Sequence, residues 1–187
     1  MYKPSIVYRM DRNKGIVKFF ITFLECLENS SYNKKVIENV GGIPLSNDLG
    51  ASVNVRLVST IDYTAGETER IEMWLDGQIV EKNNVKYLRY TEEHESRTIT
   101  TTIKLVGQQS FIMRKGAVNM RLPLNITQRE TGHYNSEAGS IPLWVDTHRL
   151  QYTYDNKSQF DVQYDLYVGG QQTGTYTLNL TFTEESS

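Results

Sequence analysis

From residue 51 onward, hydrophobic and polar residues alternate along the chain. Val53, Val55 and Leu57 alternate with Asn54 and Arg56, and the same two-residue period returns in later segments. Such a period is typical of strands that bury one face and expose the other. The inward positions that it predicts are Val53, Val55, Leu57, Ile61, Tyr63, Ile71, Met73, Leu75, Leu88, Tyr90, Ile99, Ile103, Leu105, Phe160, Val162, Tyr164, Leu166, Val168, Tyr176, Leu178, Leu180 and Phe182.

Short turn-forming segments separate these strands. They include AGE, DGQ, EKNN, GQQ, KG, SEAG, DNKS and VGGQQTG. No segment between them has the length and period of a crossover helix, so the strands follow one another as hairpins. A long antiparallel meander leaves two unpaired edges, and closure removes both. We therefore predict an all-β fold, a single antiparallel barrel of roughly eight to ten strands.

Residues 1–50 have a different pattern and are predicted to form an extension to the barrel domain at 51–187. A helical period over 16–27 indicates one amphipathic helix, and a second short helix is predicted at 33–39, ended by Gly41 and Gly42. We expect this extension to be partly helical or disordered. A signal peptide is the alternative, but the segment after the apolar run lacks a small-residue cleavage pattern. The apolar face of the first helix comprises Ile16, Phe19, Phe20, Phe23, Leu24 and Leu27.

Facing residues in the last two hairpins can be predicted from their alternation. Placing Phe160 opposite Phe182 puts every apolar residue of both strands on one face, and a slip of one residue would turn a whole set outward. In the hairpin before it, Leu150 is placed opposite Tyr164. The stretch LWVDTHRLQYTY (143–154) breaks the alternation, and a bulge between Asp146 and Arg149 would reconcile its two halves.

The hairpin around Lys115 and Gly116 has two possible registers. A two-residue loop places Met113 opposite Val118 and directs Arg114 and Arg121 into solvent. A three-residue loop places Arg114 opposite Val118 and directs it into the core. The preceding GQQ hairpin, with Leu105 opposite Phe111, requires Phe111 and Met113 inside, so we expect the first register. If Arg114 instead faces inward, the leading hypothesis becomes an anionic group bound in the barrel.

Composition narrows the class of protein. The net charge is −2, so nothing in the overall balance favours nucleic acid or an acidic membrane surface. The apolar run IVKFFITFL is too short to span a bilayer. The single cysteine, Cys26, excludes an intrachain disulfide and favours the cytoplasm. We expect a monomer or a homodimer.

No motif indicates catalysis. His94, His133 and His148 are far apart in the sequence, so no cluster has metal-ligand spacing. Phosphate-binding, dinucleotide-binding and nucleophile-elbow patterns are absent. The charged stretch EEHES (92–96) is interpreted as a hairpin turn. We therefore expect no enzyme activity, no metal and no cofactor.

The order of the segments resembles the YwiB-like family of small proteins from low-GC Gram-positive bacteria. The stretches that carry the resemblance are VKYLRYTEE, TTIKLVGQQSFIMRKGAVNM, ETGHYNSEAGSIPLWVDTHRL and FDVQYDLYVGGQQTGTYTLNLTF, within about residues 52–184. The resemblance implies a calycin-like barrel akin to lipocalins. It implies no activity and no functional residues, because the family is a domain of unknown function.

These observations favour a non-enzymatic barrel that binds a small, largely apolar ligand. A barrel of this size holds one small ligand or fills with side chains. The alternative is therefore a solid core, with the surface acting in protein interaction or self-association around Trp144, Tyr87 and Tyr167. The conflict near Asp146 is interpreted first as a simple barrel corner. The alternative is the mouth of a ligand cavity, because local inconsistencies concentrate at functional sites. The candidate ligand-binding residues are Tyr90, Trp144, Thr147, His148 and Tyr164.

Overall fold

The computed structural model describes residues 6–9, 50–94, 97–116, 118–136, 139–155 and 157–184. The two predicted helices and Cys26 lie outside these ranges. The described residues contain no helix that is long and apolar enough to cross a membrane. The strands are β1 (Ile6–Arg9), β2 (Ala51–Tyr63), β3 (Thr68–Lys82), β4 (Val85–His94), β5 (Arg97–Leu105), β6 (Gln109–Gly116), β7 (Asn119–Asn125), β8 (Glu130–Ser136), β9 (Gly139–Thr153), β10 (Ser158–Val168) and β11 (Gln171–Glu184).

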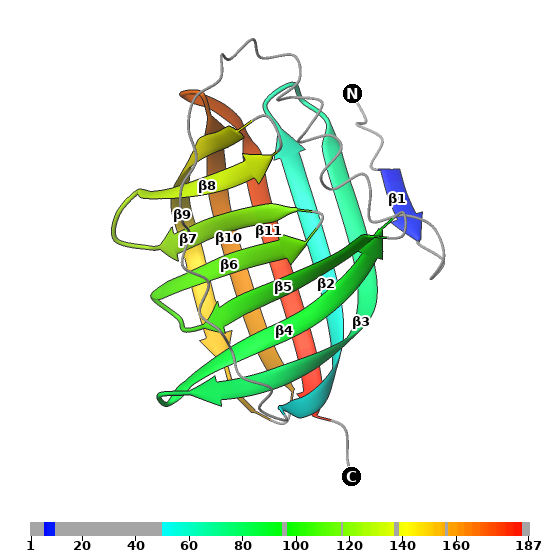
Figure 1. Ribbon diagram of the computed structural model, residues 1–187. Coiled ribbons are helices and arrows are strands. Elements are labelled where there is room, and N and C mark those ends of the chain that lie inside the picture. The colour runs from blue at the N-terminus through cyan, green and yellow to red at the C-terminus, as the bar shows by residue number, and fades with distance from the viewer. Residues whose placement is uncertain are drawn as a thin grey trace.

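Strands β2 to β11 form a closed antiparallel barrel, which confirms the predicted fold class. Each strand pairs with the next along the chain, and β11 returns to pair with β2. In Figure 1, β4 to β8 cross in front of the long strands β2, β9, β10 and β11, and β3 curves round the right-hand side to run beside β4. The interior is filled by the inward-facing side chains of both groups of strands, as the two-residue period predicts.

Two hairpins have tight two-residue turns that connect long neighbouring strands directly. Asn83 and Asn84 join β3 to β4 with φ values of 53° and 60°, and Gly169 and Gly170 join β10 to β11 with 58° and 84°. Two successive residues with positive φ are typical of a type I′ turn, whose twist matches that of the flanking strands. Asn and Gly tolerate this conformation better than other residues do.

The barrel is closed along only part of β3. The last part of that strand, from Gly77 to Lys82, pairs with β4, whereas Glu69–Glu72 pairs in parallel with β1. Gly77 lies where β4 joins, and a Cβ atom there would lie 3.0 Å from Val55 Cγ2 and 3.1 Å from the Arg89 carbonyl oxygen. Glycine at this position therefore lets the strands approach closely. The final residues of β4 pair only with β5.

At the C-terminal end, the prediction is correct about which side chains face inward, but it is wrong about which residues lie opposite one another. Phe160 lies opposite Leu180 rather than Phe182, and Leu150 lies opposite Val162 rather than Tyr164. Both shifts are of two residues, so Phe160, Leu180, Leu150 and Val162 keep their predicted inward face. The predicted bulge is confirmed, because the β9–β10 register shifts at His148.

The predicted register around β6 is wrong. Arg114 pairs with Met120, and Ile112 pairs with Ile103 on one side and Leu122 on the other. Ile112 and Arg114 therefore face the interior, whereas Phe111 and Met113 face outward. Arg121 lies on the outer face, as predicted, with its guanidinium 4.6 Å from the centre of the Phe111 ring.

Candidate functional site

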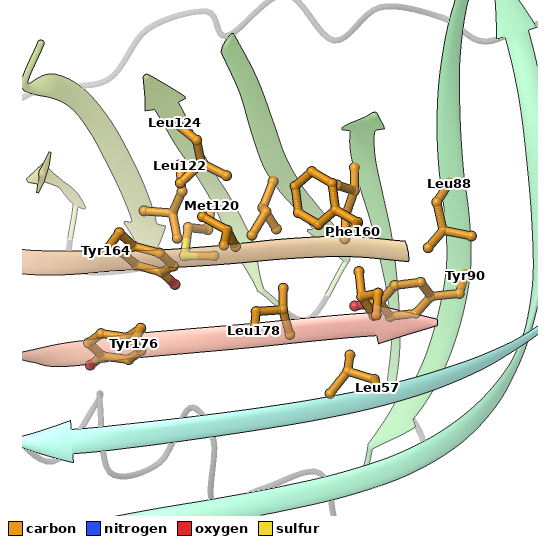
Figure 2. Close-up of a cluster of buried hydrophobic side chains, with 14 of the residues drawn as sticks. Leu57, Leu88, Tyr90, Met120, Leu122, Leu124, Phe160, Tyr164, Tyr176 and Leu178 are labelled. Atoms are coloured by element: carbon orange, nitrogen blue, oxygen red, sulfur yellow. The ribbon is translucent and has the colours of Figure 1, made fainter. Parts of the chain in front are cut away.

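A cavity of about 50 Å³ lies inside the barrel, at the level where β3 parts from β4. Since one water needs roughly 10–15 Å³ on this measure, the cavity holds about three to five waters. Leu57, Met73 and Met120 contribute apolar walls from three strands. Figure 2 shows Leu57, Met120 and Tyr164 among the side chains that fill this part of the interior. The remaining walls are Ser59, Ile71, Tyr90, Glu92, Thr101, Ile112, Arg114, Leu122, Tyr164, Tyr176 and Leu178.

An ion pair is buried in the cavity wall. Arg114 Nη2 of β6 lies 2.5 Å from Glu92 Oε2 of β4, and the two side chains are only 6% and 3% exposed. The contact passes over β5, which lies between these strands. Arg114 and Glu92 are the only charged side chains among the described residues that line the cavity. The site therefore combines apolar walls with one anchored positive and one anchored negative charge.

Burial changes the protonation of Glu92. Removal of the carboxyl group from water raises its pKa, and the neighbouring Arg114 opposes this rise without overcoming it. A guanidinium stays protonated in proteins. In this pair, Arg114 is therefore the fixed charge and Glu92 is the charge that can be neutralised.

This difference predicts how pH acts on stability. A carboxyl group whose pKa is raised by folding binds its proton more tightly in the folded state, so its contribution is present at low pH and is lost as pH rises through the folded-state pKa. We expect the wild type to lose free energy of unfolding relative to Glu92→Gln as pH rises above about 4.3, the ordinary glutamate value. Urea unfolding of both proteins across this range measures the difference. A wild type that gains stability relative to the variant would show that pairing with Arg114 outweighs burial.

Three tyrosines add hydroxyl groups to the same interior. Tyr164 and Tyr176 stack with ring centres 5.3 Å apart, side by side on β10 and β11 (Figure 2). Burial raises the pKa of Tyr90 and of Tyr164 far above the ordinary value, so both remain neutral phenols. The Tyr176 hydroxyl lies 3.4 Å from that of Thr173. These groups can hydrogen-bond to a guest but contribute no charge.

The structure brings together two of the five residues predicted to bind a ligand. Tyr90 and Tyr164 both line the cavity. Thr147 is hydrogen-bonded instead, since its hydroxyl accepts the backbone N–H of Asn125 at 3.1 Å. His148 lies on the outer surface, where its Nε2 is 3.0 Å from Asp165 Oδ2.

Trp144 also lies away from the cavity. It pairs with Tyr167 on the outer face of β9 and β10. The predicted surface patch is therefore divided, because Tyr87 lies on β4, with its ring centre 6.2 Å from that of Phe111. Among the described residues, no three His, Cys, Asp or Glu side chains gather as a potential metal site.

The sequence does not predict the ion pair, because Glu92 is assigned to a hairpin turn and the inward position of Arg114 is only the second of two registers. The signal was present, because Glu92 follows Leu88 and Tyr90 at the two-residue spacing of inward positions. An inward glutamate needs a cationic partner. Arg114 is that partner, but the predicted GQQ hairpin requires Phe111 and Met113 inside and so directs Arg114 outward.

Comparison with known proteins agrees with this fold. The family model described as "Domain of unknown function (DUF1934)" matches residues 55–180, more than half of the chain. The chain belongs to the DUF1934 family. The matched range runs from β2 to β11, so it includes the whole cavity wall.

Two comparisons confirm the resemblance to the YwiB-like proteins and their barrel fold. The chain is 29% identical over 126 residues to the "Uncharacterized beta-barrel protein YwiB" of Bacillus subtilis (strain 168), covering 67% of this chain and 89% of that protein. The crystal structure of the ywiB protein from Bacillus subtilis superposes with a TM-score of 0.66 at 25% identity, covering 74% of this chain and 95% of that one. Neither description states an activity.

Proposed function

We propose that this protein is a non-enzymatic, calycin-like binding protein that holds a small, largely apolar ligand inside its barrel, in the cytoplasm. The observation that supports the proposal is the cavity of about 50 Å³, with its apolar walls and its single ion pair. Ligand sites in proteins are typically apolar hollows with a few polar groups that fix orientation. The cavity has this composition.

Cavity size limits the ligand. Space for about three to five waters corresponds to a guest of about that many non-hydrogen atoms. Met73 and Met120 lie in the wall, and the flexible, unbranched methionine side chain adapts to irregular space better than other apolar residues do. Movement of these two side chains gives a longer apolar tail room to enter.

The methionines also provide a test of binding. A protein labelled with ¹³C at its methionine methyl groups is titrated with short alcohols, amides and carboxylates and followed by NMR. We expect the signals of Met73 and Met120 to shift, and that of Met113 to stay, because Met113 faces the outer side of β6. Native mass spectrometry of the purified protein tests whether a ligand co-purifies with it. Equal shifts at all three positions, or no shift at any, would refute binding in the cavity.

Filling the cavity should abolish binding. Ser59 is buried on β2 and lines the cavity, so Ser59→Val adds apolar volume there. We expect the variant to lose the methionine shifts and to remain folded, with a free energy of unfolding within about 1.5 kcal/mol of the wild type. Thr60→Val, at the neighbouring outward position, is the matched control and should bind normally. Unchanged binding in Ser59→Val would place the ligand elsewhere.

The second candidate is a surface that acts in protein interaction or self-association. Trp74 favours it, because its large side chain is 58% exposed on the outer face of β3. Tryptophan is enriched where proteins bind one another. Size-exclusion chromatography with small-angle scattering tests it: a homodimer that Trp74→Ser converts to a monomer supports this candidate, and a wild-type monomer at all concentrations counts against self-association.

A further inference from the structure

The buried ion pair is costly for a barrel that only needs a stable core. Removal of two charges from water carries a desolvation penalty that can equal or exceed what their mutual attraction returns. Apolar side chains of similar volume often replace such pairs without loss of stability. Glu92 and Arg114 lie where the barrel also leaves space. Their position in a cavity wall points to a ligand that uses the charges.

We propose, building on the function proposed above, that the cavity binds a small carboxylate, with Arg114 as its counter-ion and with Glu92 taking up one proton from solvent as the carboxylate arrives. The ligand remains an anion, Arg114 remains a cation, and Glu92 becomes a neutral acid. The net charge of the site is zero before and after binding. No bond other than that to the transferred proton changes.

The chemistry of the guanidinium allows two carboxyl groups at once. Its five N–H donors lie in one plane and can bind carboxylates side by side. A ligand carboxylate on Arg114 would therefore lie next to Glu92, among side chains that are almost wholly buried. Two carboxylates that share such a site do not both stay ionised, and one of them holds a proton.

The surroundings of Glu92 identify it as the group that takes this proton. Tyr90 on its own strand, Thr101 on β5, and Tyr164 and Tyr176 on β10 and β11 carry no charge, and the walls from β3 and β7 are apolar. Burial raises the pKa of Glu92, which favours its neutral form. The permanent charge of Arg114 selects an anion over an amine, because an amine would leave two cations beside one carboxylate.

Three probes of nearly equal size separate the possibilities. Propionate, propionamide and propylamine are titrated into the full-length protein by calorimetry, in buffers with different ionisation enthalpies. We expect only propionate to bind strongly, with uptake of about one proton, and its affinity to fall about tenfold per pH unit above the pKa of Glu92.

Each other result has a defined meaning. If propionamide binds as tightly as propionate, the ligand-binding function stands and the carboxylate proposal is wrong. Stronger binding of propylamine would make Glu92 the anchor and would also overturn it. If none of the three binds and no methionine signal moves, the proposed function fails as well.

A pair of variants tests the role of Glu92 directly. Glu92→Gln keeps the shape of the side chain but cannot take up a proton, so propionate should bind with no proton uptake and with an affinity that no longer depends on pH. Asp146→Asn is the matched control, because Asp146 pairs with Arg129 on the outer surface and should leave proton uptake unchanged. Uptake that persists in Glu92→Gln would assign the proton to another group. Should Glu92→Gln not fold, the proton uptake of the wild type still decides the proposal.

Discussion

Deletion of Asn179 should abolish folding, although the residue removed is polar and lies on the outer face. Asn179 is in the middle of β11, which pairs with β2 without any interruption. Removal of one residue from a regular strand turns one flank over. Either Tyr176 and Leu178 or Leu180 and Phe182 would then leave the core. Two such side chains are worth about 3–6 kcal/mol, and polar groups would enter in their place. This cost is comparable to the whole stability of a typical domain, about 5–15 kcal/mol.

Deletion of His148 should leave the barrel folded. His148 is the extra residue of the bulge, and its neighbours Thr147 and Arg149 already pair with the consecutive residues Tyr164 and Gln163. Without His148, Thr147 and Leu150 remain inward and the strand becomes regular. The exposed contact with Asp165 is worth at most about 1 kcal/mol. Circular dichroism and thermal unfolding of the two deletion variants measure the contrast. A folded Asn179 deletion or an unfolded His148 deletion would contradict the observed registers.

Replacement of Glu92 by leucine should lower the free energy of unfolding by about 3–5 kcal/mol, because it leaves the charge of Arg114 buried without its carboxylate. Arg114→Met should cost less, since the remaining Glu92 can take up a proton and lose its charge. The double variant, Glu92→Leu with Arg114→Met, should recover most of the stability. Urea unfolding of the four proteins gives the coupling energy.

The control for this cycle is the same substitution at a surface pair. Glu72 lies with its Oε1 2.7 Å from Arg56 Nη2, on the outer face of β2 and β3. Glu72→Leu should change stability by no more than about 1 kcal/mol. Propionate should also raise the free energy of unfolding of Glu92→Leu, because it can pair with Arg114. It should not raise that of the double variant, which lacks Arg114. Equal losses for Glu72→Leu and Glu92→Leu would mean that Arg114 is not held inside the barrel.

Most of the fold could be predicted from the sequence because most strands have one apolar and one polar face. In β2, β10 and β11, a change of face would expose a complete set of large side chains, so alternation alone determines which residues are buried. The bulge at His148 could be predicted for the same reason, since Val145 and Leu150 both belong inside although their spacing is odd. The exact partner of each residue could not be predicted, because a register shift of two residues leaves every side chain on the same face of the sheet.

Strand β6 could not be predicted in this way because both of its faces are buried. Phe111, Ile112 and Met113 are consecutive and all shielded from solvent. The Tyr87 ring and the Arg121 guanidinium contact Phe111 from outside, so its position carries no information about the interior. In such a strand, alternation cannot tell which side chains face the interior. The choice depends on the ion pair between Arg114 and a residue two strands away.

The cavity itself depends on side-chain packing across many strands, which no local pattern reports. Tyr90 and Tyr164 could be predicted to face inward, but not to border space. Trp144 and His148 were expected near a cavity mouth because their segment breaks the alternation. The structure shows that the break is a bulge, with both side chains on the outer face.

A high-resolution crystal structure of the protein with propionate tests the central claim most directly. We expect Arg114 inside the barrel, the propionate carboxylate against its guanidinium beside Glu92, and the propionate methyl group toward Met73 and Met120. A structure in which Arg114 points into solvent, with Phe111 and Met113 in the core, would contradict the account.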